Sequence, residues 1–297
     1  MEATLRLFRQ GRRNGMLKVG ILGLGLIGGS IAKSLKNFSK EVVIAGFDTN
    51  RQNANFALEN KLINYLIHEI TEENMDHDVV IIAVPISELK NIFAQLSKIK
   101  KPLIITDVCS VKEPVIEIAK QLLGNKLSSF VPGHPISGLE LSGPENSEDN
   151  LFSDSPVLLT PLDETSKQAI EAVKKIWEDM GAKALIIDAS LHDKFLAATS
   201  HIPHVLAYMA MHTVQTLEVE DLEYFIGGSF RDLTRVAESS PALWGNIFLN
   251  NKKNIIDICQ VFIDNLSSFQ TMLENEDTIA LASYLEIAQK AKFKLKN

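Results

Sequence analysis

From Leu17 onwards, the first half of the chain alternates short, continuously apolar runs with longer stretches in which apolar residues recur every three or four positions. The short β-branched runs predict strands, and the longer stretches predict helices. We expect strands at 18–24, 42–48, 78–84, 102–108 and 127–131, and helices at 26–38, 51–60, 87–99 and 111–123. This alternation indicates βαβ units and a parallel sheet, and strands that are apolar throughout fit a sheet covered on both faces.

The pattern changes in the second half of the chain. Two more apolar runs, 155–161 and 183–188, flank a predicted helix at about 163–180 and are expected to continue the same sheet. After Asp188 the strand pattern stops, and the remaining residues are helical in pattern almost throughout. The change predicts an α/β domain followed by an all-α domain, with these limits: 16–188 and 189–297.

The first fifteen residues stand apart from this pattern. They carry four Arg and one Glu, and they lack the apolar segment of a secretory signal. A disordered tail over residues 1–15 is the expectation, and an Arg-rich transit peptide is the alternative.

The turn after the first predicted strand carries Gly23, Gly25 and Gly28, and this G-x-G-x-x-G spacing opens a predicted helix. The first glycine of such a turn permits a tight bend, the second lets the backbone approach a pyrophosphate, and the third lets the helix pack against the strand. The amides of Leu26 and Ile27, at the helix N-terminus, would hold that pyrophosphate. A Rossmann-type dinucleotide-binding domain is therefore expected, and a glycine-rich turn without a ligand is the alternative.

An acidic residue follows the second strand at the position that selects the dinucleotide. Asp48 lies 20 residues after Gly28, where a carboxylate takes the ribose hydroxyls and repels a 2′-phosphate. NAD is therefore favoured over NADP, although Arg51 could accept that phosphate. Asp48 could instead cap the next helix. Val84 and Pro85, after the strand at 78–84, are expected to line the same cofactor site.

Composition excludes several classes of protein. The 297 residues carry a net charge of −7, which disfavours nucleic acid as a partner. No apolar run approaches the roughly 18 residues that span a bilayer, so no membrane association is expected. The two cysteines, Cys109 and Cys259, cannot form a disulfide framework, and this usage fits a reducing cytoplasm.

Polar residues follow two neighbouring strand ends, where ligands of a doubly wound sheet bind. Ser110 follows the strand at 102–108, and His134 lies in the segment Pro132–Gly138. The prolines and glycines of that segment indicate a rigid loop rather than a helix or a central strand. Ser110 and His134 are therefore expected to face the nicotinamide end, with His134 as a base for an alcohol proton. Ser110 could orient the histidine or bind the same hydroxyl. A structural histidine bonded to backbone is the alternative for His134.

Two further histidines, His201 and His204, lie three residues apart in a predicted helix, so both can face one cleft. Zinc is one interpretation, but no third ligand at a suitable spacing is evident, and no metal is expected. Pro203, between them, is expected to kink the helix.

The run Gly133–Gly143 resembles the GHP-x-x-G-x-E-x-S-G motif of the prephenate and arogenate dehydrogenases. Residues 106–112 are similar to that family's serine-bearing segment, and 199–207 and 227–244 are similar to its helical-domain signatures. The resemblance covers roughly residues 17–295. It implies an all-α dimerisation domain and NAD-dependent oxidative decarboxylation of prephenate to 4-hydroxyphenylpyruvate, in tyrosine biosynthesis. Arogenate, which would give tyrosine directly, is the alternative substrate.

The resemblance also implies roles for residues around the reacting ring. His134 takes the hydroxyl proton, and Ser110 fixes the hydrogen-bond geometry. Arg235 holds the ring carboxylate as a bidentate pair, although a surface salt bridge would explain the same residue. His204 contacts the substrate side chain.

The remaining motif residues have supporting roles by the same resemblance. Gly228 lets the backbone approach the side chain of the substrate, and His201 supports the site. Trp244 closes the pocket, with core packing as the alternative. Glu140 and Asp193 are candidates for an ionic network at the cleft mouth, and solvated surface charges are the alternative.

Two other functions compete with this interpretation, and a homodimer is expected in addition. A β-hydroxyacid dehydrogenase would use Lys112 in catalysis, but its place in the first turn of a helix favours an ordinary exposed lysine. An NAD-binding protein without activity would be expected to lose His134 or Arg235. The wide apolar stripe of 254–274 needs a partner surface, so we expect a homodimer through the helical domain, as the resemblance also implies.

Overall fold

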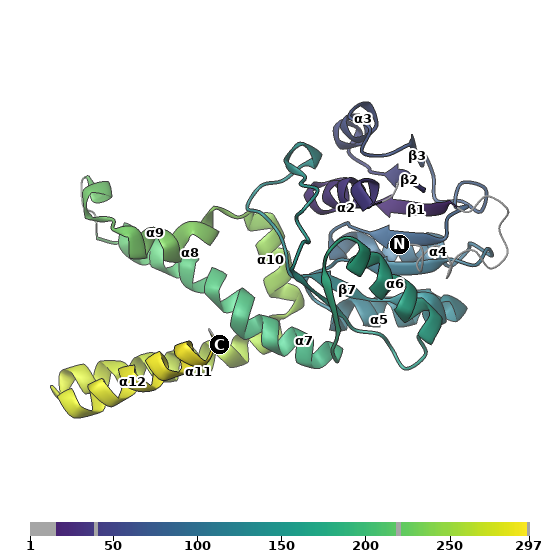
Figure 1. The fold of residues 1–297 in the computed structure, drawn as a ribbon. Coiled ribbons are helices and arrows are strands. Elements are labelled where there is room, and N and C mark those ends of the chain that lie inside the picture. Colours follow the sequence, from purple (N-terminus) through teal and green to yellow (C-terminus); the bar gives the residue numbers. More distant parts are fainter. Residues whose placement is uncertain (1–15, 39–40, 218–220, 296–297) are drawn as a thin grey trace.

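The computed structural model describes residues 16–38, 41–217 and 221–295, and it confirms an α/β domain followed by a helical domain (Figure 1). The expected tail over residues 1–15 lies outside the described residues and stays a prediction. The helical domain extends away from the sheet as two arms, one formed by α8 and α9 and the other by α11 and α12 (Figure 1).

Six parallel strands form the main sheet in the order β3-β2-β1-β4-β5-β6. Their bounds are β1 (Leu17–Leu22), β2 (Val42–Phe47), β3 (Tyr65–Leu66), β4 (Val79–Ile82), β5 (Ile104–Asp107) and β6 (Phe130–Val131). The order reverses between β1 and β4, and ligands of open α/β sheets bind beyond the strand ends at such a point.

Helices cover both faces of this sheet, as continuously apolar strands require. Helices α2 (Leu26–Phe38), α3 (Arg51–Glu59) and α6 (Lys167–Asp179) contribute to one buried apolar cluster. Helices α4 (Leu89–Leu96) and α5 (Glu113–Leu122) contribute to the other.

A second, three-stranded sheet corrects two predictions. The runs expected to continue the main sheet form β8 (Pro156–Leu159) and β9 (Lys183–Ile186), which join β7 (Gly133–Pro135) in the order β7-β8-β9. His134 therefore lies on a short edge strand instead of a loop. An edge strand is where a proline is tolerated, because Pro135 has no amide to donate.

The strand predicted at 127–131 is also shorter than expected. Only its last two residues form β6, and a 3₁₀ helix occupies Gly124–Ser129.

The helical domain begins directly after β9. Its elements are α7 (Ala189–Leu196), a π-helical turn (Ala197–His201), α8 (Ile202–Gln215), η5 (Leu222–Phe225), α9 (Gly228–Thr234), η6 (Arg235–Glu238), α10 (Pro241–Asn250), α11 (Lys252–Glu274) and α12 (Thr278–Lys294). Pro203 lies in the first turn of α8, so the helix irregularity expected at this proline lies in the π-helical turn just before it.

Much of the apolar surface of the helical domain is uncovered. Its buried cluster consists of Ala197, Ile202 and Ile255, with a few half-buried neighbours. Large apolar side chains of α11, Ile256 and Ile263 among them, are more than half exposed. Within 16–38, 41–217 and 221–295, no helix combines the length and apolarity needed to cross a bilayer.

Candidate active site

The turn between β1 and α2 has the geometry expected of each of its glycines. Gly23 has a φ of 98°, and a Cβ there would collide with the carbonyl group of Ala83. A Cβ on Gly28 would collide with the carbonyl oxygen of Gly23, so only glycine lets the helix start this close to the strand. At Gly25 nothing lies within 4 Å of a Cβ position, which leaves the backbone open to a ligand at the start of α2.

Asp48 fixes this turn from the end of β2. Its Oδ2 accepts a hydrogen bond from the amide of Leu24 at 2.8 Å, and its Oδ1 accepts one from the amide of Asn50 at 2.7 Å. The interpretation of Asp48 as a helix cap is wrong, because Asn50 caps α3 through the amide of Gln52. The half-buried carboxylate keeps lone pairs for ribose hydroxyls, while Arg51 is exposed at the start of α3.

The loop after β4 borders the same turn. A side-chain methyl of Val84 lies 3.0 Å from the position that a Cβ on Gly23 would take. The Val84 carbonyl accepts a hydrogen bond from the Cys109 thiol at 3.7 Å, and Pro85 is exposed beside it. The predicted cofactor residues of β1, β2 and β4 therefore gather at one edge of the sheet.

Lys112 corrects a prediction, because its side chain is fully buried. Its Nζ forms an ion pair with Asp107 at 2.6 Å and donates to the carbonyl of Gly133 at 2.6 Å. Asp107 also accepts from the amides of Cys109 and Gly133. This buried pair joins the loop that carries half-buried Ser110 to the strand that carries His134.

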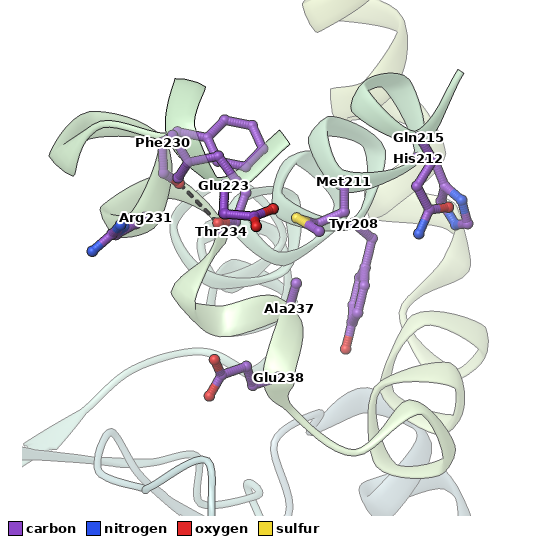
Figure 2. A pocket seen from close by; sticks show the side chains of 11 residues that line it. Tyr208, Met211, His212, Gln215, Glu223, Phe230, Arg231, Thr234, Ala237 and Glu238 are labelled. Carbon is purple, nitrogen blue, oxygen red and sulfur yellow. Dashed lines mark hydrogen bonds between the residues drawn. The ribbon is translucent and has the colours of Figure 1, made fainter. Parts of the chain in front are cut away.

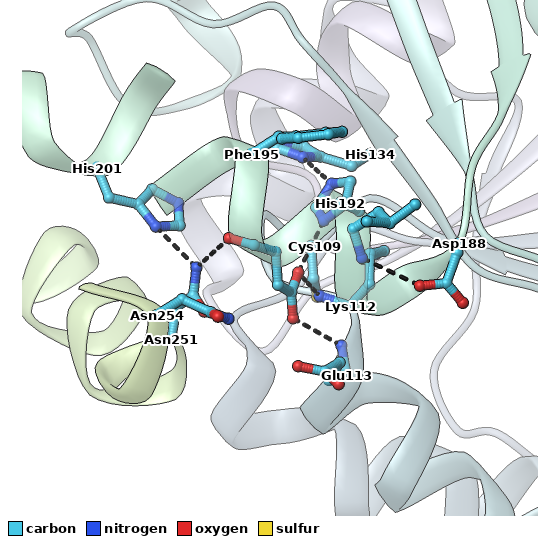
Figure 3. Close-up of polar contacts among 12 residues, drawn as sticks. Cys109, Lys112, Glu113, His134, Asp188, His192, Phe195, His201, Asn251 and Asn254 are labelled. Carbon is cyan, nitrogen blue, oxygen red and sulfur yellow. Dashed lines mark hydrogen bonds and ion pairs between the residues drawn. The ribbon is translucent and has the colours of Figure 1, made fainter. Parts of the chain in front are cut away.

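The imidazole of His134 is hydrogen-bonded to a histidine that the sequence analysis did not select. Its Nδ1 lies 2.9 Å from Nε2 of His192, and Nδ1 of His192 lies 2.7 Å from Oδ1 of Asp193 (Figure 3). Burial lowers the pKa of His134 well below 6.5, and nearby His192 and Lys112 lower it further. His134 is therefore neutral at neutral pH.

Asp193 is not a solvated surface charge. It is buried, and its carboxylate accepts the amides of Lys112 and Glu113 at the start of α5. The interpretation of Asp193 as a solvated charge is therefore wrong, and these bonds dock α7 on the nucleotide-binding domain. Its part in an ionic network at the cleft mouth stays a prediction.

His201 and His204 have different surroundings, although both approach Trp244. His201 is buried, Asn251 donates to its Nδ1 at 3.1 Å, and burial lowers its pKa to about 4. His204 donates from Nδ1 to the carbonyl of Ser200 and stacks on Trp244 with ring centroids 3.4 Å apart. Trp244 thus contacts both histidines, and it is half-buried rather than part of a closed core.

Arg235 connects the helical domain to the segment after His134. Its guanidinium forms an ion pair with Glu140, and its side chain is 63% exposed. Glu140 raises and Arg235 lowers the pKa of His204, so both charges lie near that ring. Gly228, at the start of α9, has open space where a Cβ would lie. Among the described residues, no group of three or more His, Cys, Asp or Glu is placed to hold a metal ion.

Comparison with known proteins identifies the family. A family model described as the nucleotide-binding domain of prephenate dehydrogenase matches residues 31–186, and one described as the dimerization domain of prephenate dehydrogenase matches residues 188–287. The chain belongs to the prephenate dehydrogenase family.

Full-length relatives agree with this assignment to the prephenate dehydrogenases. A cyclohexadienyl dehydrogenase of Zymomonas mobilis is 34% identical over 282 residues, 94% of this chain and 96% of that protein. A prephenate dehydrogenase of Bacillus subtilis is 35% identical over 275 residues, 91% of this chain and 73% of that protein. The crystal structure of prephenate dehydrogenase from Aquifex aeolicus, with hydroxyphenyl propionate and NAD⁺, has a TM-score of 0.88 at 33% identity and covers 94% of this chain and 98% of that one.

The dimerisation domain of this prephenate dehydrogenase family member also contains a cavity. It has a volume of about 560 Å³ and lies between α8, η5, α9 and η6 (Figure 2). Its lining includes the apolar side chains of Met211, Ile226 and Phe230, and it contains none of the predicted site residues. The cavity is therefore not assigned to the chemistry.

Two residues of the site were missed from sequence, His192 and Asn251, and the burial of Lys112 was not expected. The only local signal for His192 is its place beside Asp193 at the start of a predicted helix. The partner of His192 lies 58 residues away, at His134, and that of Asn251 lies 50 residues away, at His201.

Proposed function

We propose that this chain catalyses the NAD-dependent oxidative decarboxylation of prephenate to 4-hydroxyphenylpyruvate. The observation that carries the proposal is the imidazole of His134, held by His192 at the edge of a nucleotide-binding domain and followed six residues later by Glu140, the partner of Arg235. Such a base and such a cation suit an alcohol that bears carboxylates. Membership of the prephenate dehydrogenase family supports the same reaction.

The residues around the glycine-rich turn fit NAD. The open backbone at Gly25 and the N-terminal amides of Leu26 and Ile27 would hold the pyrophosphate, and Asp48 would hold the adenosine ribose. Val84 and Pro85 would line the path towards the nicotinamide. When bound, NAD⁺ accepts the hydride that leaves C4 of the substrate ring.

His134 then acts as the general base. It takes the proton of the C4 hydroxyl as hydride leaves that carbon, the ring carboxylate departs as CO₂, and the ring becomes aromatic. The C4 oxygen of the aromatic product then takes a proton back, which restores the neutral base. Ser110 lies in the loop that the Lys112 ion pair joins to Gly133, and in the proposal it orients the same hydroxyl.

The helical domain supplies the substrate contacts in this proposal. Arg235 binds the ring carboxylate, for which it exchanges its contact with Glu140. The stacked His204 and Trp244 bind the side chain, and Gly228 lets the backbone approach it. His201 supports this wall through Asn251.

Arogenate is the second candidate substrate, since it differs only in carrying an amino group in place of the keto group. A carboxylate near the side chain would favour that ammonium, and Glu140 lies close enough to His204 to raise its pKa. The similarity to a cyclohexadienyl dehydrogenase agrees with this candidate.

The proposal includes a homodimer through the helical domain. What supports it is the exposed apolar face of α11 and the match of residues 188–287 to a dimerization domain. A cytoplasmic location is part of the proposal, and the free state of both cysteines, Cys109 and Cys259, supports it.

Formation of NADH from NAD⁺ and prephenate, measured by absorbance, tests the function. Arogenate and NADP⁺ are assayed in parallel, and the ratio of kcat/KM values assigns the substrate and the cofactor. The variant His134→Asn is expected to lower kcat by about 10²–10⁴. Absence of turnover with both substrates would instead indicate a protein that binds the dinucleotide without catalysis.

A further inference from the structure

The hydrogen bonds around Asp193 fix where its neighbours carry their protons. Asp193 Oδ1 accepts the amide of Lys112 at 2.8 Å, and Oδ2 accepts the amide of Glu113 at 2.9 Å. A carboxylate that caps a helix N-terminus in this way acts as an acceptor. The 2.7 Å contact with His192 is therefore an N–H that His192 donates from Nδ1.

The same logic carries over to His134. A neutral imidazole with its proton on Nδ1 has only a lone pair on Nε2. With His192 in this neutral form, its Nε2, which lies 2.9 Å from Nδ1 of His134, accepts the N–H that His134 donates from Nδ1 (Figure 3). Its own Nε2 is left without a proton.

We propose that His192 is a positioning residue that holds His134 in the tautomer with a bare Nε2, the nitrogen that takes the substrate proton. The proposal rests on the function proposed above. An imidazole without such a partner favours the proton on Nε2, which would present a donor to the substrate hydroxyl instead of a base. Serine proteases use a buried aspartate to hold their catalytic histidine in the correct tautomer. Here Asp193 would fix the tautomer of His192, and His192 would in turn fix the tautomer of His134.

The surroundings of His192 suit this role. Its side chain is fully buried, and its ring meets the ring of His134 edge to face, with centroids 5.1 Å apart and planes at 65°. When His134 accepts a proton on Nε2, it becomes an imidazolium whose Nδ1–H still donates to His192. No second proton needs to move.

Nitrogen-15 spectroscopy of the histidine rings in the full-length protein tests the tautomer without any substrate. The signals of His134 are assigned by their loss in His134→Asn. We expect a protonated Nδ1 and an unprotonated Nε2 in the wild type, and a shift of the proton towards Nε2 in His192→Asn. A wild-type His134 with its proton on Nε2 would overturn the proposal, because His192 would then be the donor.

Two amide variants separate positioning from packing. In His192→Gln, the side-chain amide oxygen reaches the position of Nε2 and can accept the hydrogen bond from His134. In His192→Asn, the side chain is too short for its amide oxygen to reach that position. We expect His192→Asn to lower kcat by about 10²-fold, within the usual worth of a general base, with KM little changed. His192→Gln is expected to recover at least tenfold of that loss at an equal melting temperature. Equal kcat in the two variants would reject the role.

The two proposals fail in different ways. If the wild type turns over neither prephenate nor arogenate, the proposed function is wrong, while the ring spectrum still decides the tautomer. If turnover occurs but the spectrum shows the opposite tautomer, only the role of His192 is wrong.

Discussion

Replacing Lys112 by methionine is expected to destabilise the nucleotide-binding domain strongly. The change removes the 2.6 Å ion pair with Asp107 and the 2.6 Å bond to the Gly133 carbonyl, both fully buried. The Asp107 carboxylate would keep only the amides of Cys109 and Gly133, at 2.9 and 3.3 Å. Removing one partner of a buried ion pair costs about 3–5 kcal/mol, a large share of the roughly 5–15 kcal/mol that keeps a protein folded.

Urea unfolding, followed by the fluorescence of Trp177 in a Trp244→Phe background, measures this loss. Trp177 is buried in α6 and therefore reports on the nucleotide-binding domain. The matched control is Lys174→Met, since that side chain is 37% exposed and 3.9 Å from Glu178, and it should change stability by no more than about 0.5 kcal/mol.

A double variant distinguishes an unpaired charge from lost packing. Asp107→Asn combined with Lys112→Met removes both charges, so it should be more stable than Lys112→Met alone. A loss below about 1 kcal/mol for the single variant, or a double variant with the summed losses of both changes, would refute the reasoning.

Three further predictions concern activity and assembly. As pH is lowered, kcat/KM should fall with an apparent pKa below 6.5, because burial and nearby His192 lower the pKa of His134 and only its neutral form accepts a proton. An acid-side decrease centred at or above pH 6.5 would contradict this. Arg235→Ala should raise KM and lower kcat/KM, with a loss of transition-state stabilisation of about 1.5–3 kcal/mol. An unchanged KM would indicate that Arg235 has a structural role and does not bind the substrate. Ile256→Glu with Ile263→Glu should give monomers by light scattering, whereas Asn265→Glu, on the opposite face of α11, should leave the dimer intact.

The glycine-rich turn was predictable because its constraints are local. A Cβ on Gly28 would meet Gly23 within the turn between β1 and α2, and this steric demand for glycine shows directly in the sequence. The parallel sheet followed for the same reason, since its strands are apolar along their whole length and alternate with helices.

The second sheet could not be predicted, because an apolar run does not specify its pairing partner. The pattern of 155–161 fits either sheet, and the choice depends on an antiparallel register between His134 and Leu158. The segment Pro132–Gly138 was correctly excluded from a central strand, but its place on an edge strand depends on pairing with β8, which the pattern of the segment itself does not show.

Buried charges were missed for a related physical reason. An exposed lysine is the sound expectation for a helix start, because burial of Lys112 is tolerated only with Asp107 and the Gly133 carbonyl in place. The alternative of a solvated Asp193 failed in the same way, because its carboxylate accepts the backbone amides of Lys112 and Glu113, which lie 81 and 80 residues away.

Three contacts that the sequence did not reveal join the two domains. Asp193 of α7 caps α5, His192 beside it bonds to His134, and Arg235 pairs with Glu140. The proposed base therefore has its partner in one domain and its backbone in the other. It follows that the tautomer of His134 is set only when the helical domain is docked, so a change that loosens this junction should lower kcat before it lowers affinity for NAD⁺, whose proposed site lies within the first domain.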